Sequence, residues 1–306
     1  MLRPAIPPFP RLPESLIPMS HAAVAEEQIV GDDRDFTFTT RDFERVRQLI
    51  HARAGIALSE SKRDMVYSRL GRRLRALNLE SFKDYLDQLE ARGSADEWQA
   101  FTNALTTNLT SFFREAHHFD ILREFLVKKG RHTPAKIWCS AASTGEEPYS
   151  LAITACEAYD SLTPPVKILA TDIDTNVLET AEAGVYPEER IEKLGDARKR
   201  RFFRRGSGAN AGKVRVIDEL RDLVSFRPLN LLDARYPMKG PFDALFCRNV
   251  MIYFDKPTQR DILMKMAPLL SADGLFFAGH SESFFHATDI VTSIGRTVYR
   301  RAPARG

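Results

Sequence analysis

The stretch Ile137-Trp-Cys-Ser-Ala-Ala-Ser-Thr-Gly-Glu-Glu-Pro-Tyr-Ser150 joins a short apolar run to a helical pattern that continues to Tyr159. A strand that turns directly into a helix is the repeating unit of parallel α/β sheets. In open sheets of this kind, the turn after the first strand is where nucleotide-like ligands bind. The stretch therefore predicts both the fold class and the position of a ligand site.

The same alternation of strand and helix continues downstream of this turn. Strands are expected at Val166–Thr171, 223–227, Phe242–Cys247 and Leu275–Ala278, and helices at Thr175–Ala183 and Pro257–Leu270. Between about residues 186 and 226 the pattern is interrupted: Gly206, Gly208 and Gly212 surround a predicted hairpin, and Val214 and Val216 form a strand-like run. We expect a small antiparallel insertion there, in which this run pairs with the run at residues 223–225.

Upstream of the turn the pattern is helical. Residues 32–105 show apolar side chains at helical spacing, with Thr40 and Ser81 as candidate caps, which predicts an all-helical N-terminal domain. Residues 106–116 join it to the α/β domain at 117–306. This linker carries Phe112 and Phe113 among polar groups, so it either packs into a cleft or is an ordinary connection. Residues 1–31 hold six of the 17 prolines and are interpreted as a flexible tail.

Composition excludes several classes of protein. The 306 residues carry 44 Lys and Arg against 41 Asp and Glu, a net charge of +3 that requires no nucleic-acid partner. Three scattered cysteines fit neither a disulfide framework nor a zinc site, and no apolar run is long enough to span a membrane. We expect a cytoplasmic protein that binds no metal. His117, His118 and His132 lack ligand spacing and are expected at the surface.

The predicted turn favours a cationic ligand over a dinucleotide. It holds one glycine instead of the GxGxxG fingerprint, and Glu146 and Glu147 stand where a pyrophosphate would otherwise lie. S-adenosylmethionine, which has an ammonium group, a sulfonium and ribose hydroxyls, suits such a site. Alternatively, the two acids are simply favoured in a first helical turn. Asp172, at the end of the second strand, is placed to accept the ribose hydroxyls, whereas Asp174 is a candidate helix cap.

These features resemble a known family, the bacterial chemotaxis receptor methyltransferases or CheR family. The resemblance covers about Asp35 to Arg300. It is carried by Thr106 to Glu115, Ser143-Thr-Gly-Glu-Glu-Pro-Tyr-Ser150, Ala170-Thr-Asp-Ile-Asp174, Asn230-Leu-Leu232, Phe246-Cys-Arg-Asn-Val-Met-Ile-Tyr-Phe254 and Gly279-His-Ser-Glu282. It implies an N-terminal helical domain and a Rossmann-like methyltransferase domain with a small β-subdomain inserted in it.

The resemblance also implies an activity and its residues. Methyl would pass from S-adenosylmethionine to glutamates on the cytoplasmic helices of chemoreceptors, leaving S-adenosylhomocysteine. Cofactor contacts fall on Asn108, Thr110, Arg114, Glu147, Asp172, Asn230, Leu231, Arg248 and Asn249. Arg114 and Tyr253 match the residues closest to the transferred methyl. In some members the β-subdomain also grips a receptor C-terminal peptide, and the loop 205–212 looks like theirs. We expect a monomer. The alternative is a module that binds the cofactor without turnover.

A basic helix in the N-terminal domain offers a docking surface. Lys62, Arg69 and Arg73 lie near one stripe of it and Arg72 is beside them, so an acidic receptor helix could bind there. The alternative is a solvated helix face. No general base is expected at the active site, because a glutamate side chain has an ordinary pKa of about 4.3 and is already an anion at neutral pH.

Overall fold

The computed structural model describes residues 35–303, and the predicted tail over residues 1–31 lies outside them. The N-terminal part of these residues is helical: α1 Thr40–Ala54, α2 Arg63–Ala76, α3 Phe82–Arg92 and α4 Ala95–Leu105. Ser81 caps α3 as predicted, but α1 is capped by Thr39 and not by Thr40, through a reciprocal pair of bonds with Asp42. The apolar stripes of the four helices share one core around Phe43, Leu70 and Phe101.

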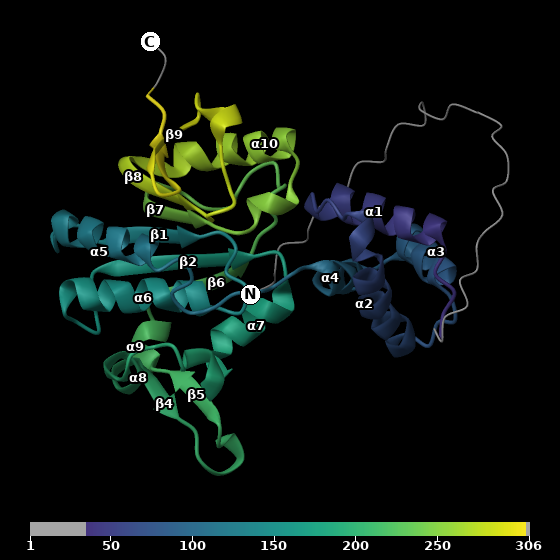
Figure 1. Ribbon diagram of the computed structural model, residues 1–306, viewed down its shortest axis with the longest axis horizontal. Helices are drawn as coiled ribbons and strands as arrows, with labels where there is room; N and C mark the ends of the chain where they lie inside the picture. The colour runs from purple at the N-terminus through teal and green to yellow at the C-terminus, as the bar shows by residue number, and fades with distance from the viewer. Residues whose placement is uncertain (1–34, 304–306) are drawn as a thin grey trace, which may run out of the picture. The chain divides into compact units, whose positions relative to one another are not determined.

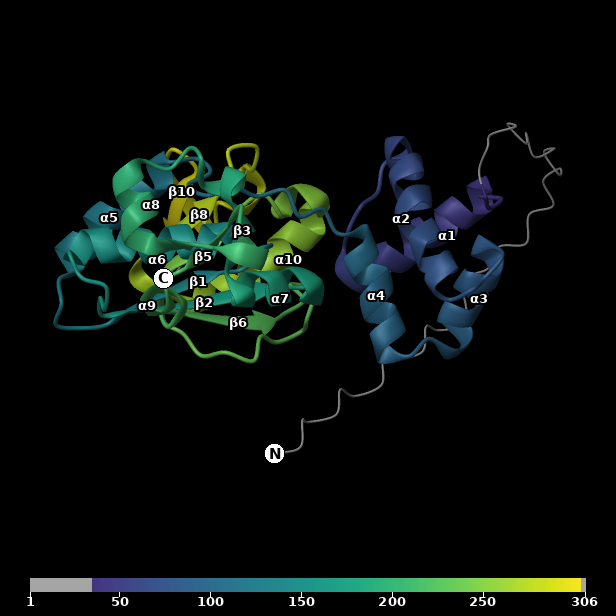
Figure 2. The ribbon, with the colours of Figure 1, turned by 90° about the horizontal axis from the view of Figure 1, so that it is seen from below.

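The remaining residues build a seven-stranded sheet in the order β6-β2-β1-β7-β8-β10-β9. Its strands are β1 Ala135–Cys139, β2 Val166–Asp172, β6 Val224–Pro228, β7 Phe242–Cys247, β8 Leu270–Ala278, β9 Val291–Gly295 and β10 Val298–Arg301. Strands β6, β2, β1, β7 and β8 pair in parallel, and β10 and β9 extend the sheet antiparallel. Figure 2 shows β1, β2 and β6 side by side.

The order of the strands places the ligand crevice. The chain adds β2 and β6 on one side of β1 and then β7 and β8 on the other, so the direction of winding reverses between β1 and β7. At such a switch point the loops that follow two neighbouring strands diverge and leave a crevice at their carboxyl ends. The predicted turn at Ser143–Gly145 follows β1, and Arg248 follows β7, so both lie at this point.

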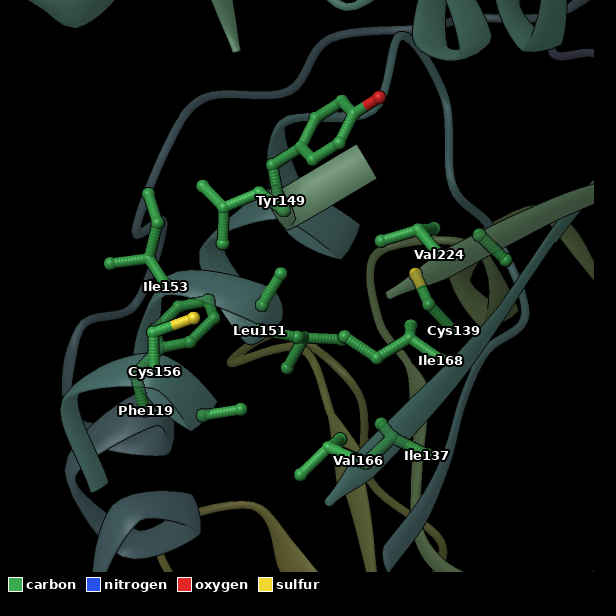
Figure 3. Packing of buried hydrophobic residues seen from close by; sticks show 14 of the residues in the cluster. Phe119, Ile137, Cys139, Tyr149, Leu151, Ile153, Cys156, Val166, Ile168 and Val224 are labelled. Atoms are coloured by element: carbon green, nitrogen blue, oxygen red, sulfur yellow. The ribbon is translucent and has the colours of Figure 1, made fainter. Parts of the chain in front are cut away.

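Helices cover both faces of the sheet (Figure 1). Alternate residues of the strands face α5 His117–Lys129, α6 Glu146–Tyr159 and α7 Thr175–Ala183 on one side, and α10 Lys256–Met266 on the other. Figure 3 shows the first of these cores around Leu151 of α6 and Ile168 of β2. Helix α6 has the predicted bounds, and nearly all its residues are buried because it lies between the main sheet and the small one.

A second, three-stranded antiparallel sheet follows α7. It consists of β3 Val185–Pro187, β4 Phe203–Arg205 and β5 Lys213–Val216 in the order β3-β5-β4, with α8 Asp196–Phe202 and α9 Asp218–Arg221 beside it. The antiparallel insertion is therefore present, but one predicted pairing is wrong. Val214 and Val216 pair with β3 and β4, whereas residues 224–228 pair with β2 in the main sheet.

Candidate functional site

A pocket opens at the carboxyl ends of β1, β2 and β7. Its walls come from the loops after these strands, from the linker after α4, and from the segment between α1 and α2. Every residue that was predicted to contact the cofactor or the transferred methyl lines it: Asn108, Thr110, Arg114, Glu147, Asp172, Asn230, Leu231, Arg248, Asn249 and Tyr253.

The turn between β1 and α6 is shaped by two left-handed residues. Ser143 has φ 47° and Gly145 has φ 98°. A Cβ on Gly145 would come within 2.7 Å of the Tyr186 hydroxyl and 2.8 Å of the Ala181 Cβ, so only glycine fits this position. The turn brings Ser143 and Glu147 to the pocket wall.

The two acids at the start of α6 have different surroundings. Glu146 is fully buried, forms an ion pair with Arg190 and accepts a hydrogen bond from the Thr144 hydroxyl at 2.6 Å. Arg190 also donates to the Thr110 carbonyl at 3.1 Å, so Glu146 fastens the β-subdomain to the linker. Glu147 alone of the two lines the pocket. Glu146 therefore has a structural role at the start of the helix, and Glu147 is the acid that a ligand in the pocket could contact.

Asp172 ends β2 with its carboxylate against the turn. It accepts hydrogen bonds from the backbone N–H of Ser143 at 2.8 Å and of Asp174 at 3.0 Å. Burial raises the pKa of Asp172 to about 6, although these backbone bonds act in the opposite direction. Asp174 instead caps α7 and accepts a bond from the Asn108 amide at 2.8 Å. The cap predicted at Asp174 is confirmed, and Asp172 lines the pocket, where contact with a ribose stays a prediction.

A buried ion cluster forms one wall of the pocket. The Arg248 side chain is fully buried and forms ion pairs with Glu147 and, at 3.3 Å, with Glu115. The Glu115 carboxylate also accepts from His280 Nδ1 at 2.9 Å and from the Asn249 amide at 3.3 Å. Although burial opposes it, the His280 bond and the Arg248 charge lower the pKa of Glu115 to about 2. Sequence reasoning missed Glu115 and His280, which lie 165 residues apart.

The loop after β7 is held by a second acid that sequence reasoning did not assign. Glu282 is buried, and its carboxylate accepts the backbone N–H of Asn249 at 3.0 Å, of Met251 at 2.8 Å and of Gly279. Burial raises the pKa of Glu282. The family motif that ends in Glu282 was the available signal, but only the fold shows which backbone it reaches.

The linker packs closely, as one of the two interpretations expected. Phe112 is buried against Tyr186 and Phe203, and the Phe113 backbone N–H donates to the Ser150 hydroxyl at 2.9 Å. Phe113 and Glu115 both have left-handed φ angles, 53° and 59°, which are strained for such residues. Arg114 lies between them and donates to the Leu109 carbonyl at 2.9 Å.

The helical domain closes the pocket on one side. The Asn230 amide donates to the Arg53 carbonyl at 2.7 Å, and the Ala57 backbone N–H donates to the Tyr253 carbonyl at 3.0 Å. Within residues 35–303, the Tyr253 hydroxyl has no hydrogen-bond partner and lines the pocket. It therefore remains available to a bound molecule.

The four basic residues predicted for docking divide into two kinds. Lys62 and Arg72 are exposed, and Lys62 lines the mouth of the pocket. Arg69 donates to the backbone carbonyls of Ala104 and Thr106, and Arg73 forms a two-bonded ion pair with Glu97. These two side chains hold α2 against α4 and the linker, so their charge is already partly satisfied.

The surface prediction for the histidines is wrong at His118. Its ring is fully buried and bonds to the Thr297 hydroxyl at 3.0 Å and the Arg296 carbonyl at 3.1 Å. Burial lowers the pKa of His118 to about 4, so it is a neutral core residue. In residues 35–303 no group of three or more His, Cys, Asp or Glu side chains could hold a metal ion. No helix in this part of the chain is long and apolar enough to cross a membrane.

The residues of the pocket fit S-adenosylmethionine. Burial disfavours the ionised form of Asp172. Hydroxyl donors would stabilise that form, and a ribose supplies two hydroxyls. The cluster of Glu147, Arg248 and Glu115 holds two acids and one base, which suits a ligand with an ammonium and a sulfonium. An open sheet with this charged pocket at its switch point, and with no glycine-rich phosphate loop, is that of an S-adenosylmethionine-dependent methyltransferase.

Comparisons with known proteins give the same class and a family. The model "CheR methyltransferase, SAM binding domain" matches residues 108–300, and "CheR methyltransferase, all-alpha domain" matches residues 41–106. The chain is 56% identical over 274 residues to Chemotaxis protein methyltransferase 2 of Pseudomonas aeruginosa, covering 89% of this chain and 97% of that one. It is 52% identical over 257 residues to the Chemotaxis protein methyltransferase of Escherichia coli, covering 84% and 89%.

This chain belongs to the CheR methyltransferase family. The predicted class, cofactor and fold are thereby confirmed: it is an S-adenosylmethionine-dependent methyltransferase of chemotaxis, with an all-helical domain before its catalytic domain.

Proposed function

We propose that the protein transfers methyl from S-adenosylmethionine to glutamate side chains of chemoreceptors and forms glutamate methyl esters. The observation that carries this proposal is the identity of 52–56% to chemotaxis protein methyltransferases along nearly their whole length. The bound cofactor supplies an electrophilic methyl on a sulfonium. A carboxylate oxygen of the substrate forms the new bond to carbon while the carbon–sulfur bond breaks and its electron pair stays on sulfur.

The side chains in the pocket support an alignment role for the enzyme. The substrate carboxylate is already ionised, so no proton has to be removed from it. Of the pocket's acids, Glu147 is paired with Arg248 and Asp172 with backbone N–H groups. Holding oxygen, carbon and sulfur in line is then the main contribution to the rate. We assign this positioning to Arg114 and to the unpartnered hydroxyl of Tyr253.

Lys62 and Arg72 are proposed to dock the receptor. Both are exposed on or beside α2, and Lys62 stands at the mouth of the pocket, so an acidic helix that crosses α2 could present a glutamate to Tyr253. Edge strands β3 and β4 of the small sheet are proposed to take up a receptor C-terminal peptide as an added strand.

The experiment that tests the proposal is methyl transfer from radiolabelled S-adenosylmethionine to membranes that contain chemoreceptors. A glutamate ester releases methanol in mild base, whereas a methylated amine does not. We expect base-labile label on the receptor. Receptors whose methyl-accepting glutamates are replaced by alanine serve as the control and should remain unlabelled. Label that resists base, or cofactor binding with no turnover on any receptor, would refute the proposal.

A further inference from the structure

One side of the cofactor pocket holds two buried carboxylates around one guanidinium. Arg248 lies between Glu147 and Glu115, all three side chains are at most about a tenth exposed, and no second cation within residues 35–303 is buried with them. A Glu147–Arg248 pair alone would be neutral. Glu115 adds one further negative charge behind it.

The neighbours of Glu115 do not remove this charge. Its low pKa keeps the carboxylate ionised at neutral pH. His280 donates to it from Nδ1, but that ring is 67% exposed, so solvent weakens the effect of any charge that it carries. His118 Nδ1 lies 3.7 Å from Glu115 Oε2, and the ring is neutral because burial lowers the pKa of His118. The Asn249 amide is uncharged.

The cofactor and its product differ in charge at one atom, the sulfur. S-adenosylmethionine carries an ammonium, a carboxylate and a sulfonium, for a net charge of +1. S-adenosylhomocysteine has a neutral thioether instead of the sulfonium, for a net charge of zero. Their other groups are identical, so a charge in the pocket wall separates the two molecules only through the sulfonium.

We propose that Glu115 is a specificity-determining residue that favours the methylated cofactor over its demethylated product. It acts through Arg248: with Glu115 present, the cluster of Glu115, Arg248 and Glu147 is negative, and without it the guanidinium of Arg248 is offset by Glu147 alone. The inference rests on the cofactor and not on the identity of the methyl acceptor. A sulfonium about 7 Å from the Glu115 carboxylate, at effective dielectric constants between about 20 and 80, would gain about threefold to fiftyfold in the affinity of S-adenosylmethionine.

The test compares dissociation constants for S-adenosylmethionine and S-adenosylhomocysteine by calorimetry in Glu115→Gln. We expect S-adenosylmethionine to bind about threefold to fiftyfold more weakly, and S-adenosylhomocysteine to change by less than about threefold. Glu157→Gln is the control. It also removes one carboxylate from an ion pair, with Arg198, but at the far end of α6. Its ratio of the two affinities should equal that of the wild type.

A second pair of variants keeps the proposal testable if Glu115→Gln folds poorly. His280 is exposed, so His280→Lys should fold and place a cation beside Glu115. It should lower the preference for S-adenosylmethionine, by less than Glu115→Gln does, while His280→Gln, which adds no charge, should leave it unchanged. The inference is overturned if the ratio of the two affinities stays at the wild-type value in Glu115→Gln or, should that variant fold poorly, in His280→Lys, and also if His280→Gln shifts it as far as His280→Lys.

Discussion

The carboxylate of Asp172, at the end of β2, accepts the backbone N–H of Ser143, in the turn after β1, at 2.8 Å. One acid thereby ties together two strand ends at the wall of the pocket. It holds the left-handed turn at Ser143 and lines the pocket with its remaining lone pairs.

Replacing Asp172 by Ala should weaken the binding of S-adenosylhomocysteine by about 1.5–3 kcal/mol, the range for hydrogen bonds to a charged group. Calorimetry measures the change. The lost bond to Ser143 would also loosen the turn, so Ser143→Ala, which keeps its backbone N–H, is the control and should bind nearly as tightly as the wild type. An unchanged affinity in Asp172→Ala would contradict the ribose assignment.

Cofactor affinity should also depend on pH through this residue. In the free protein the pKa of Asp172 is raised to about 6 by burial, and hydroxyl donors from a ribose favour its anion. Binding therefore releases a proton below about pH 6. We expect affinity for S-adenosylhomocysteine to be level from pH 8 to pH 7 and up to about tenfold weaker at pH 5. Asp172→Asn should bind weakly at every pH with a flat profile; a profile that still falls in this variant would assign the titration to another group.

The proposed docking surface on α2 is best tested at an exposed residue, and not at Arg69 or Arg73. Reversal of Arg69 or Arg73 to Glu would break contacts with Thr106 or Glu97 and should lower stability as well as methylation. Arg72 is exposed, so Arg72→Glu should reduce receptor methylation several-fold and leave both the melting temperature and cofactor affinity unchanged. The wild-type rate should fall with added salt, because exposed charges are screened beyond about 8 Å at physiological ionic strength. Normal methylation by Arg72→Glu would assign α2 to a solvated face.

Glu282 should contribute to the stability of the fold, although it does not line the pocket. Its carboxylate satisfies three backbone N–H groups: those of Asn249 and Met251 in the loop after β7, and that of Gly279 after β8. In Glu282→Gln an amide N–H₂ would face one of these donors, which costs about 1.5–3 kcal/mol of unfolding free energy. Urea unfolding with and without S-adenosylhomocysteine measures it. Wild-type stability in this variant would show that the loop holds its shape without Glu282.

Features set by neighbours in the sequence could be predicted. The bounds of α6 and α7, the cap at Asp174 and the pocket positions of Asp172 and Asn249 all follow from local patterns and strand ends. The partners of Arg69 and Glu115 could not be predicted, because only the fold brings them together. His118 looked like a surface residue because its burial depends on the β9–β10 turn, which the sequence analysis did not identify.

The pH profile of methyl transfer separates alignment from proton transfer. If the substrate carboxylate attacks unaided, no group of the enzyme needs to titrate near neutrality, and the chemical step should be level there. It should fall only on the acid side, as the substrate glutamate protonates around its ordinary pKa of about 4.3. Because cofactor binding through Asp172 also weakens below about pH 6, the measurement is single-turnover transfer at saturating cofactor, with folding checked at each pH. Arg114→Ala and Tyr253→Phe should lower the rate at every pH without a new titration, since both side chains orient the reactants. A bell-shaped profile centred near neutrality that either substitution abolishes would instead give that residue a role in proton transfer.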